Sequence, residues 1–368
     1  MILMNDFAAE PAALREAMVA AATRVFASGW YVLGPEVRAF EGEWSARCDG
    51  AHTLGVANGM DAIELSLRAL DIGPGDEVIT TPMTAFATAL AICRAGATPI
   101  FADIDPQTAL LSPDSVRRCL SPRTRAIVLV HLYGQVHGME AWVELCREAG
   151  IELIEDCAQS HLARWSGRAA GTFGATGAFS FYPTKNLGAI GDGGAVVTGS
   201  ATIATRISQL RNYGQSERYV HPLAGMNSRL DELQAALLSE RLKWLPEFTQ
   251  RRRAIAGAYF EGLRRPDVRP MAPPLQADAH VHHLFVVRCQ ARDPLQAHLT
   301  ACGVQSLIHY PIPVHRQEPC RGMRADPMGL RHAEAHASAC LSIPCHPQMS
   351  DSDVDRVIDA IERFECPR

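Results

Sequence analysis

The chain has 368 residues, of which 47% are hydrophobic and 20% charged, a composition typical of a globular protein. Its length favours two domains, because one hydrophobic core rarely serves so many residues. The formal net charge of −5 gives no basic surplus for nucleic acid, and no stretch approaches the length of a membrane span, so we expect neither nucleic acid nor a membrane as a partner.

The cysteines and the N-terminus indicate a cellular compartment. The 11 cysteines are scattered, without a CxxC pair or the spacing of zinc ligands, which favours reduced thiols. The first residues, MILMNDFAAEP, reach Asp6 and Glu10 early and lack the basic and then apolar pattern of a signal peptide. We therefore expect a cytoplasmic protein.

The first 160 residues predict an N-terminal arm followed by an alternating pattern. Pro11 suits the first turn of a helix over residues 11–27, and the segment up to residue 50 is expected to be an arm or entry helix packed on the main domain. Short β-branched runs then alternate with helical ones, which indicates a mostly parallel sheet covered on both faces. The expected strands are residues 52–56, 77–81, 98–104, 126–134 and 151–156, and the expected helices are 61–70, 85–94, one from 112–113, and 139–149.

The stretch AFSFYPTKNLGAIGDGGAVV, residues 178–197, places Lys185 in a turn-prone segment between two β-rich runs. A lysine at a strand end can trap a carbonyl group if its surroundings lower its pKa. A solvated loop lysine is the alternative interpretation of this window.

The second half of the chain predicts a long helix and then a change of character. Ser228 and Asp231 have capping-box spacing at the start of a helix in the NSRLDELQAALL segment. After Pro246 we expect a basic helix to Leu263, a Pro-rich connection, a β-run and a helix from Pro294. The predicted organisation is an arm over residues 1–50, a large α/β domain over 51–246 and a smaller α+β domain over 247–368, which the N-terminal segment can join.

Asp156 closes the strand 151–156, at the edge of the sheet where α/β proteins bind ligands. Its carboxylate is either a helix cap or a partner of Lys185. A pyridine-ring cofactor needs both groups, because a carboxylate keeps its ring nitrogen protonated and a lysine holds its aldehyde as a Schiff base. The pair is a first indication of a pyridine-ring cofactor.

The same cofactor carries a phosphate, and the sequence offers a cradle for it. Asn58, Gly59 and Met60 lie between the first strand and the helix that follows, where free backbone N–H groups can bind an anion. Ser180 can add a hydroxyl. Phe86 either stacks on a flat ring or belongs to the core.

Together these motifs resemble the DegT/DnrJ/EryC1/StrS family of pyridoxal-phosphate sugar aminotransferases, which have the aspartate-aminotransferase fold (fold type I), a mostly parallel α/β sheet in a large domain with a smaller α+β domain. The resemblance covers nearly the whole chain. It rests on the segments SGWYVLGPEVRAFE, VANGMDAIELSLRAL, IGPGDEVIT, GATPIFADIDP, PRTRAIVLVHLYGQ, IEDCAQSH, FSFYPTKNLGAIGDGGAVVT, LRNYGQ, NSRLDELQAALL and IHYPIPVH.

The resemblance implies roles for individual residues. Lys185 would be the Schiff-base lysine, Asp156 the partner of the ring nitrogen, and Gln159 a neighbour of the phenolic oxygen. It further implies that Phe86 covers the ring, that Asn227 reaches the phosphate of a neighbouring subunit, and that two residues line the sugar pocket. The residues implied at the phosphate of the same subunit are Asn58, Gly59, Met60 and Ser180, and those at the sugar are His309 and Tyr310.

Four positions depart from the family pattern or suggest other chemistry. Ala85 stands where a threonine is frequent before the stacking aromatic, which leaves one polar contact near the cofactor open, and Cys157 replaces a frequent alanine of similar volume. His280 and His282 would share one face of a strand, but no carboxylate or cysteine stands nearby, so we expect no metal site.

The implied reaction is transamination in two half-reactions, with glutamate as the amino donor and a keto sugar linked to a nucleoside diphosphate as the acceptor. The motifs look most similar to the branch acting on dTDP-linked 3-keto-6-deoxyhexoses, in polysaccharide or antibiotic biosynthesis, with a homodimer that shares its active sites. Amination at carbon 4 of a UDP-, GDP- or dTDP-linked 4-keto sugar is the alternative. A non-catalytic regulator of the same fold is a further one, and the complete set of Asp156, Gln159 and Lys185 argues against it. A dehydratase would carry histidine in place of Lys185, and a nicotinamide enzyme would show a GxGxxG motif after the first strand, which is absent.

Overall fold

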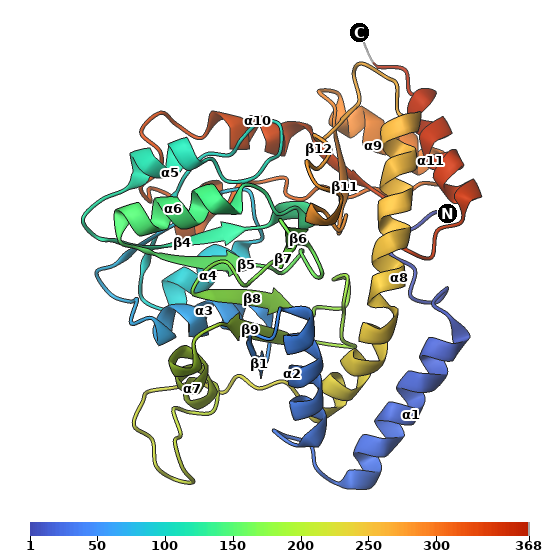
Figure 1. Ribbon diagram of the computed structural model, residues 1–368. Coiled ribbons are helices and arrows are strands. Elements are labelled where there is room, and N and C mark those ends of the chain that lie inside the picture. The colour runs from blue at the N-terminus through green and yellow to red at the C-terminus, as the bar shows by residue number, and fades with distance from the viewer. Residues whose placement is uncertain (367–368) are drawn as a thin grey trace.

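A seven-stranded sheet forms the centre of the larger part of the molecule in the computed structural model, which describes residues 1–366 (Figure 1). The strand order is β1-β9-β8-β5-β4-β2-β3, and every neighbouring pair is parallel except the two that involve β9. The mostly parallel α/β sheet confirms the predicted fold class. The strands are β1 (His52–Val56), β2 (Glu77–Thr80), β3 (Thr98–Phe101), β4 (Thr124–Val130), β5 (Glu152–Asp156), β8 (Thr176–Ser180) and β9 (Gly194–Thr198).

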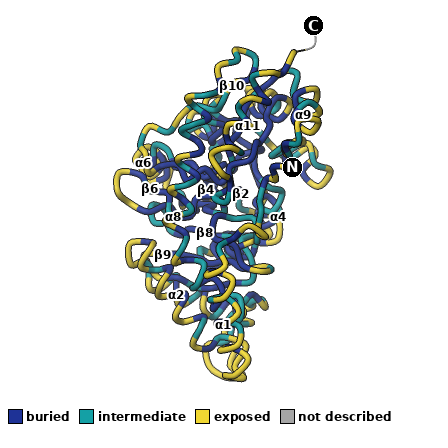
Figure 2. The backbone as a smooth tube through the Cα atoms, turned by 90° about the vertical axis from the view of Figure 1, so that its right-hand side faces the viewer, coloured by how far each residue is buried: buried dark blue, intermediate teal, exposed yellow. Residues whose placement is uncertain are grey.

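Two layers of helices cover the sheet because consecutive strand residues point to opposite faces. Ile127 and Leu153 pack into one core, whereas their neighbours Val128 and Ile154 pack into the other. The first core is covered by α2 (Pro35–Arg47), α5 (Pro113–Cys119), α6 (Met139–Ala149) and the beginning of α8 (Glu232–Gly262), and the second by α3 (Gly59–Ala69), α4 (Phe86–Arg94) and α7 (Ala201–Leu210). Figure 2 shows the buried chain between these layers, with the outer helices more exposed.

The smaller part of the molecule has a core of its own. It surrounds an antiparallel sheet of β10 (Arg269–Pro270), β11 (Phe285–Arg288) and β12 (Cys340–Ile343), with α9 (Arg292–Ala301) and α11 (Asp351–Glu362). Ile2 joins this core and pairs with Val304, so the first residues of the chain belong to it. A third helix, α10 (Arg331–Ala339), packs on a cluster that also contains Phe101 of the large sheet.

The N-terminal helix and several short elements lie around these cores. The helix α1 (Ala12–Ser28) lies along α8 (Figure 1). The remaining elements are the hairpin β6 (Arg164–Trp165) and β7 (Arg168–Ala169), and the 3₁₀ turns η1 (Leu132–Gly134), η2 (Ala277–Ala279), η3 (Val314–Arg316) and η4 (Glu318–Cys320). Within residues 1–366, no helix combines the length and the apolarity needed to cross a membrane.

The helix α8 differs from the sequence prediction both at its start and at its end. Ser228 does not cap it, because the helix begins at Glu232, and the Ser228 hydroxyl instead accepts a hydrogen bond from the Ala57 N–H at 3.1 Å. Pro246 does not end it either, and the predicted boundary at 246–247 falls inside this one helix. Packing overrides the proline, since Leu245 is buried in the first core of the large sheet and Tyr259 in the core of the smaller part of the molecule.

Candidate active site

The predicted site residues gather at the carboxyl ends of β5 and β8 and at the start of α3. Asp156 is the last residue of β5 and is buried. Lys185 follows β8 by five residues, in a turn whose flanking Phe181 and Leu187 are anchored in the core. The arrangement follows from the parallel sheet, which brings the ends of neighbouring strands to one edge.

Lys185 is an amine in a mostly desolvated position. Burial lowers the pKa of its ammonium group to about 8, and the charge of Asp156 opposes that change. Burial and then the Lys185 charge lower the pKa of His161 to about 3 and that of His309 to about 4. A substantial fraction of Lys185 is therefore neutral near pH 8, as a nucleophile or a general base requires.

Asp156 is held by polar groups on both carboxylate oxygens. The Thr88 hydroxyl donates to its Oδ2 at 2.9 Å, and the Ala158 N–H donates to its Oδ1 at 3.1 Å. Because the Thr88 proton goes to the carboxylate, its oxygen accepts from the Thr84 hydroxyl at 2.9 Å. Burial raises the pKa of Asp156, and these two hydrogen bonds and the Lys185 charge oppose the rise. Thr84 and Thr88 thus provide polar support beside Ala85, the position where the family often has threonine.

The start of α3 forms a close-packed backbone cradle. Asn58 is its N-cap, and its side chain accepts from the Asp61 N–H at 2.8 Å. A Cβ at Gly59 would lie 2.6 Å from the Cβ of Ser180, and one at Gly194 would lie 2.5 Å from the Asn58 carbonyl. These contacts bring Ser180 against the first helical turn, whose N–H groups lack acceptors within the helix. The cradle can hold an anion, although Met60 itself packs toward the second core.

Gln159 belongs to a hydrogen-bonded group that connects the two parts of the molecule. Its side-chain oxygen accepts from the Tyr133 N–H at 2.6 Å, and its amide nitrogen lies 3.4 Å from the Tyr310 hydroxyl. The Tyr133 hydroxyl donates to the His309 carbonyl at 2.7 Å. The His309 ring is paired through Nδ1 with the Ser342 hydroxyl at 2.8 Å. The residues predicted for the sugar pocket therefore lie beside Gln159.

Phe86 and Asn227, which were also predicted to bind the cofactor, lie on other segments of the chain. Phe86 is the first residue of α4 and packs in the same apolar cluster as Tyr133 and Tyr310. Asn227 is exposed, in an isolated backbone pairing with Asn212, outside the group around Lys185.

The histidines considered for a metal are arranged differently from the prediction. His280 and His282 lie outside any strand, their rings stack 3.9 Å apart, and the His282 N–H donates to the His280 ring at 3.0 Å. In the described part of the chain, His131, Glu155 and Cys157 form a compact group of possible ligand atoms. Its carboxylate already accepts from backbone N–H groups, including that of Gly171, which gives it a structural role.

Comparison with known proteins identifies the family. The model of the DegT/DnrJ/EryC1/StrS aminotransferase family matches residues 12–362. The chain belongs to this family. A dTDP-3-amino-3,4,6-trideoxy-alpha-D-glucose transaminase of Streptomyces venezuelae is 45% identical over 358 residues, which cover 95% of this chain and 93% of that protein.

Two further comparisons extend this result. A dTDP-3-amino-3,6-dideoxy-alpha-D-galactopyranose transaminase of Aneurinibacillus thermoaerophilus is 44% identical, with 94% of each chain covered. The crystal structure of S. venezuelae DesV in complex with a ketimine intermediate superposes with a TM-score of 0.95 at 44% identity, and covers 100% of this chain and 99% of that one. The protein is thus an aminotransferase of the DegT/DnrJ/EryC1/StrS family, as the sequence motifs predicted.

Residue-by-residue reasoning missed two members of the site of this aminotransferase. Thr88 lies on the first turn of α4, and Tyr133 belongs to the HLYGQ segment, which carried the resemblance without a role for the tyrosine. A hydroxyl facing the sheet on an otherwise apolar helix turn was the available signal for Thr88. Tyr133 offered none, because its partners lie 26 and 176 residues away in sequence.

Proposed function

We propose that the protein transfers an amino group from glutamate to carbon 3 of a dTDP-linked 3-keto-6-deoxyhexose, with pyridoxal phosphate as cofactor, as a cytoplasmic homodimer. The observation that carries this proposal is the pairing of a desolvated Lys185 with a buried, hydrogen-bonded Asp156 at adjacent strand ends. The two relatives named above support the sugar, since both names specify a dTDP-linked 3-amino sugar.

The residues present fit this cofactor. Asp156 retains room for an N–H donor beside its bonds from Thr88 and Ala158, which suits a protonated ring nitrogen. The α3 cradle with Ser180 suits a phosphate. When bound, pyridoxal phosphate supplies an aldehyde that carries the amino group and a ring that delocalises electrons released at the substrate carbon.

The chain itself supplies proton transfer and positioning. Lys185, with a pKa of about 8, can accept a proton at Nζ from the carbon of the amino donor in the first half-reaction and can donate a proton from Nζ to the sugar carbon in the second. With the cofactor bound, the buried Asp156 carboxylate would hold the proton on the ring nitrogen. Gln159 and Tyr310, which face one another, are placed to orient polar groups of the cofactor and the sugar.

A homodimer with shared sites is supported by the surface around this region. The Lys185 loop exposes Tyr182 and Ile190, and the segment before Asn227 exposes Tyr213 and Tyr219. Exposed large apolar side chains on such loops are typical of a surface that a second copy covers. Asn227 is exposed as well, so its side chain is available to the partner's phosphate site.

The decisive experiment is an amination assay with a panel of nucleotide-linked 3-keto and 4-keto sugars, with glutamate as the donor. We expect turnover of a dTDP-linked 3-keto-6-deoxyhexose. Efficient amination of a 4-keto sugar with no activity on any 3-keto sugar would establish the alternative function, amination at carbon 4. If cofactor-loaded protein aminates no sugar, the result would favour a non-catalytic regulator.

Two controls separate the parts of this proposal. Borohydride treatment and peptide mapping should fix the cofactor on Lys185, and label on another lysine would refute that assignment. Mixing Lys185→Ala with Asn227→Ala should restore partial activity through mixed dimers, and no recovery after demonstrated subunit exchange would argue against shared sites.

The sugar contacts can be tested through the two half-reactions. Tyr310→Phe or His309→Ala removes a hydrogen-bonding group worth about 1–3 kcal/mol, so we expect the sugar half-reaction to slow roughly 5- to 150-fold. The glutamate half-reaction should change little. An equal loss in both half-reactions would show that these residues support the cofactor and do not contact the sugar specifically.

A further inference from the structure

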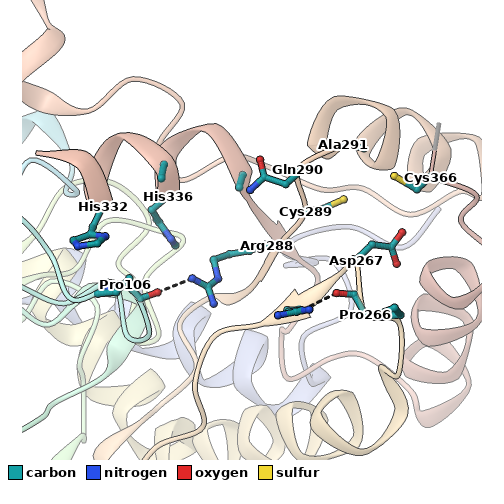
Figure 3. A pocket seen from close by; sticks show the side chains of 13 residues that line it. Pro106, Pro266, Asp267, Arg288, Cys289, Gln290, Ala291, His332, His336 and Cys366 are labelled. Carbon is teal, nitrogen blue, oxygen red and sulfur yellow. Dashed lines mark hydrogen bonds between the residues drawn. The ribbon is translucent and has the colours of Figure 1, made fainter. Parts of the chain in front are cut away.

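A cavity of about 430 Å³ lies in the smaller part of the molecule, on a side that Lys185, Asp156 and Gln159 do not line (Figure 3). Its wall combines one face of the β10–β11 pair with α10 and the segment around residue 290. The polar and charged side chains that line it include Asp267, Arg269, Arg288, Gln290, His332 and His336.

Arg269 and Arg288 stand directly opposite one another on the antiparallel strands β10 and β11. Like charges in this register repel, and such pairs destabilise a sheet unless an anion lies between or beside them. Within residues 1–366, no ion pair joins either arginine to a carboxylate. The Asp267 carboxylate is nearby, but both of its oxygens are taken by the Arg265 guanidinium at 2.9 Å.

Backbone carbonyls hold both guanidinium groups in place. Arg288 donates through Nη1 to the Pro106 carbonyl at 2.6 Å, and Arg269 donates through Nε to the Pro266 carbonyl at 2.7 Å. Figure 3 shows Arg288 extended across the cavity toward Pro106, opposite His332 and His336 on α10. Each arginine has five N–H donors, so most donors of both groups are left for a ligand, and the anchoring reduces the entropy lost on binding.

We propose that this cavity is a second binding site, for a small phosphorylated metabolite whose phosphate is held between Arg269 and Arg288. A phosphate monoester carries a charge close to −2 at pH 7 and three terminal oxygens, which matches two guanidinium groups. A carboxylate carries one charge and two oxygens, which a single arginine satisfies. The volume leaves room for a sugar-sized body, whose hydroxyls can meet Gln290 and His332.

The cavity adjoins the active site but is separate from it. His336 forms part of its wall, and the Nε2 of this buried ring lies 2.8 Å from the Tyr133 hydroxyl. Because that hydroxyl donates to the His309 carbonyl, it accepts from His336, so the imidazole carries a proton on Nε2. In the described chain, the other ring nitrogen, Nδ1, has no hydrogen-bond partner.

The test is calorimetric titration of the cofactor-loaded wild-type enzyme with glucose 1-phosphate, and with glucuronate as the carboxylate probe, a sugar of similar size with a single carboxylate. We expect saturable binding of the phosphate ester, with one site per chain, and weaker binding of glucuronate. Arg269→Gln and Arg288→Gln should each weaken glucose 1-phosphate binding at least about 10-fold, because each removes charge-assisted hydrogen bonds, and the double variant should abolish it. The matched control is Arg264→Gln, an exposed arginine of the same loop that does not line the cavity and should bind as the wild type does.

Folding of the variants is checked by thermal melting without ligand. Relief of the repulsion between the two arginines should leave the melting temperature of either single variant equal to or above that of the wild type, and transaminase turnover should be retained. Arg288→Lys keeps the positive charge but lacks the planar guanidinium with its paired N–H donors, and it should bind with intermediate affinity. The proposal is overturned if glucose 1-phosphate shows no saturable binding, if glucuronate binds as tightly, or if binding survives in the folded double variant.

Discussion

Thr88→Val tests how strongly the Asp156 carboxylate depends on its neighbours. Valine keeps the volume of the side chain and removes the hydroxyl that bonds to Asp156 Oδ2 at 2.9 Å. Thr88 is about 1% exposed, so water cannot readily replace the donor. A hydrogen bond to a charged group contributes about 1.5–3 kcal/mol, which corresponds to a loss of roughly 10- to 150-fold in kcat/KM if that energy serves the ionised carboxylate.

The pH profile separates this mechanism from a general loss of structure. Burial already raises the pKa of Asp156, and loss of the Thr88 bond raises it further. Activity that needs the ionised carboxylate is present above this pKa and is lost as pH falls through it, so the acid limb of the kcat/KM profile should move to higher pH. Thr88→Ser keeps the hydroxyl and should retain the wild-type limb. A valine variant that folds and has an unchanged acid limb would refute the reasoning.

Two other predictions concern Lys185 and Tyr133. Burial lowers the pKa of Lys185 from 10.5 to about 8. In cofactor-free protein, the unfolded chain therefore binds the Lys185 proton more tightly than the folded chain does. The free energy of unfolding consequently rises as the pH rises from about 8 toward 10.5. The stability advantage of Lys185→Met over the wild type, measured by urea unfolding, should therefore shrink between pH 7 and pH 10, and a constant difference would contradict this. Tyr133→Phe removes the bonds to the His309 carbonyl and to His336 and should slow the sugar half-reaction more than the glutamate half-reaction in single-turnover kinetics, whereas equal slowing would disprove its position on the sugar side.

Local patterns predicted the large sheet well because its strands and helices each carry their own signals. The strand at 52–56 and the helix at 139–149 have the predicted bounds, and Ser112 caps its helix as the Ser112-Pro113 signal indicated. Asp156 and Lys185 could be placed at strand ends for the same reason. The resemblance then named their partners, which spacing alone left open.

Local sequence patterns did not predict contacts between distant segments. The bond from Ser228 to Ala57 and the pairing of Gln159 with Tyr133 depend on how loops meet after the sheet has formed. Cross-strand register likewise decides that Arg269 stands opposite Arg288, although the sequence separates them by a Pro-rich connection. The partners of polar and charged side chains in loops could therefore be found only from the structure.

Glu232 shows how one such contact supports the active site. The predicted capping box of this helix consisted of Ser228 and Asp231 and left Glu232 without a role. The buried Glu232 carboxylate caps α2, where it accepts from the N–H groups of Gly34, Glu36 and Val37 at 2.7–3.0 Å. The helix α2 has no side-chain cap of its own, and its aromatic residues Phe40 and Trp44 pack edge to face against Phe181 and Phe179, just before the Lys185 turn.

Glu232→Ala should accordingly destabilise the protein by about 3–5 kcal/mol, because it leaves several N–H donors without an acceptor in a buried or half-buried position. The matched control is Asp231→Ala, since Asp231 is exposed and its side chain makes no capping bond. Urea unfolding followed by circular dichroism measures both variants. Since α2 packs on the strand that leads to Lys185, the loss should also weaken cofactor retention in Glu232→Ala. An unfolding free energy within about 1 kcal/mol of wild type would show that water replaces the carboxylate and that α2 does not depend on this cap.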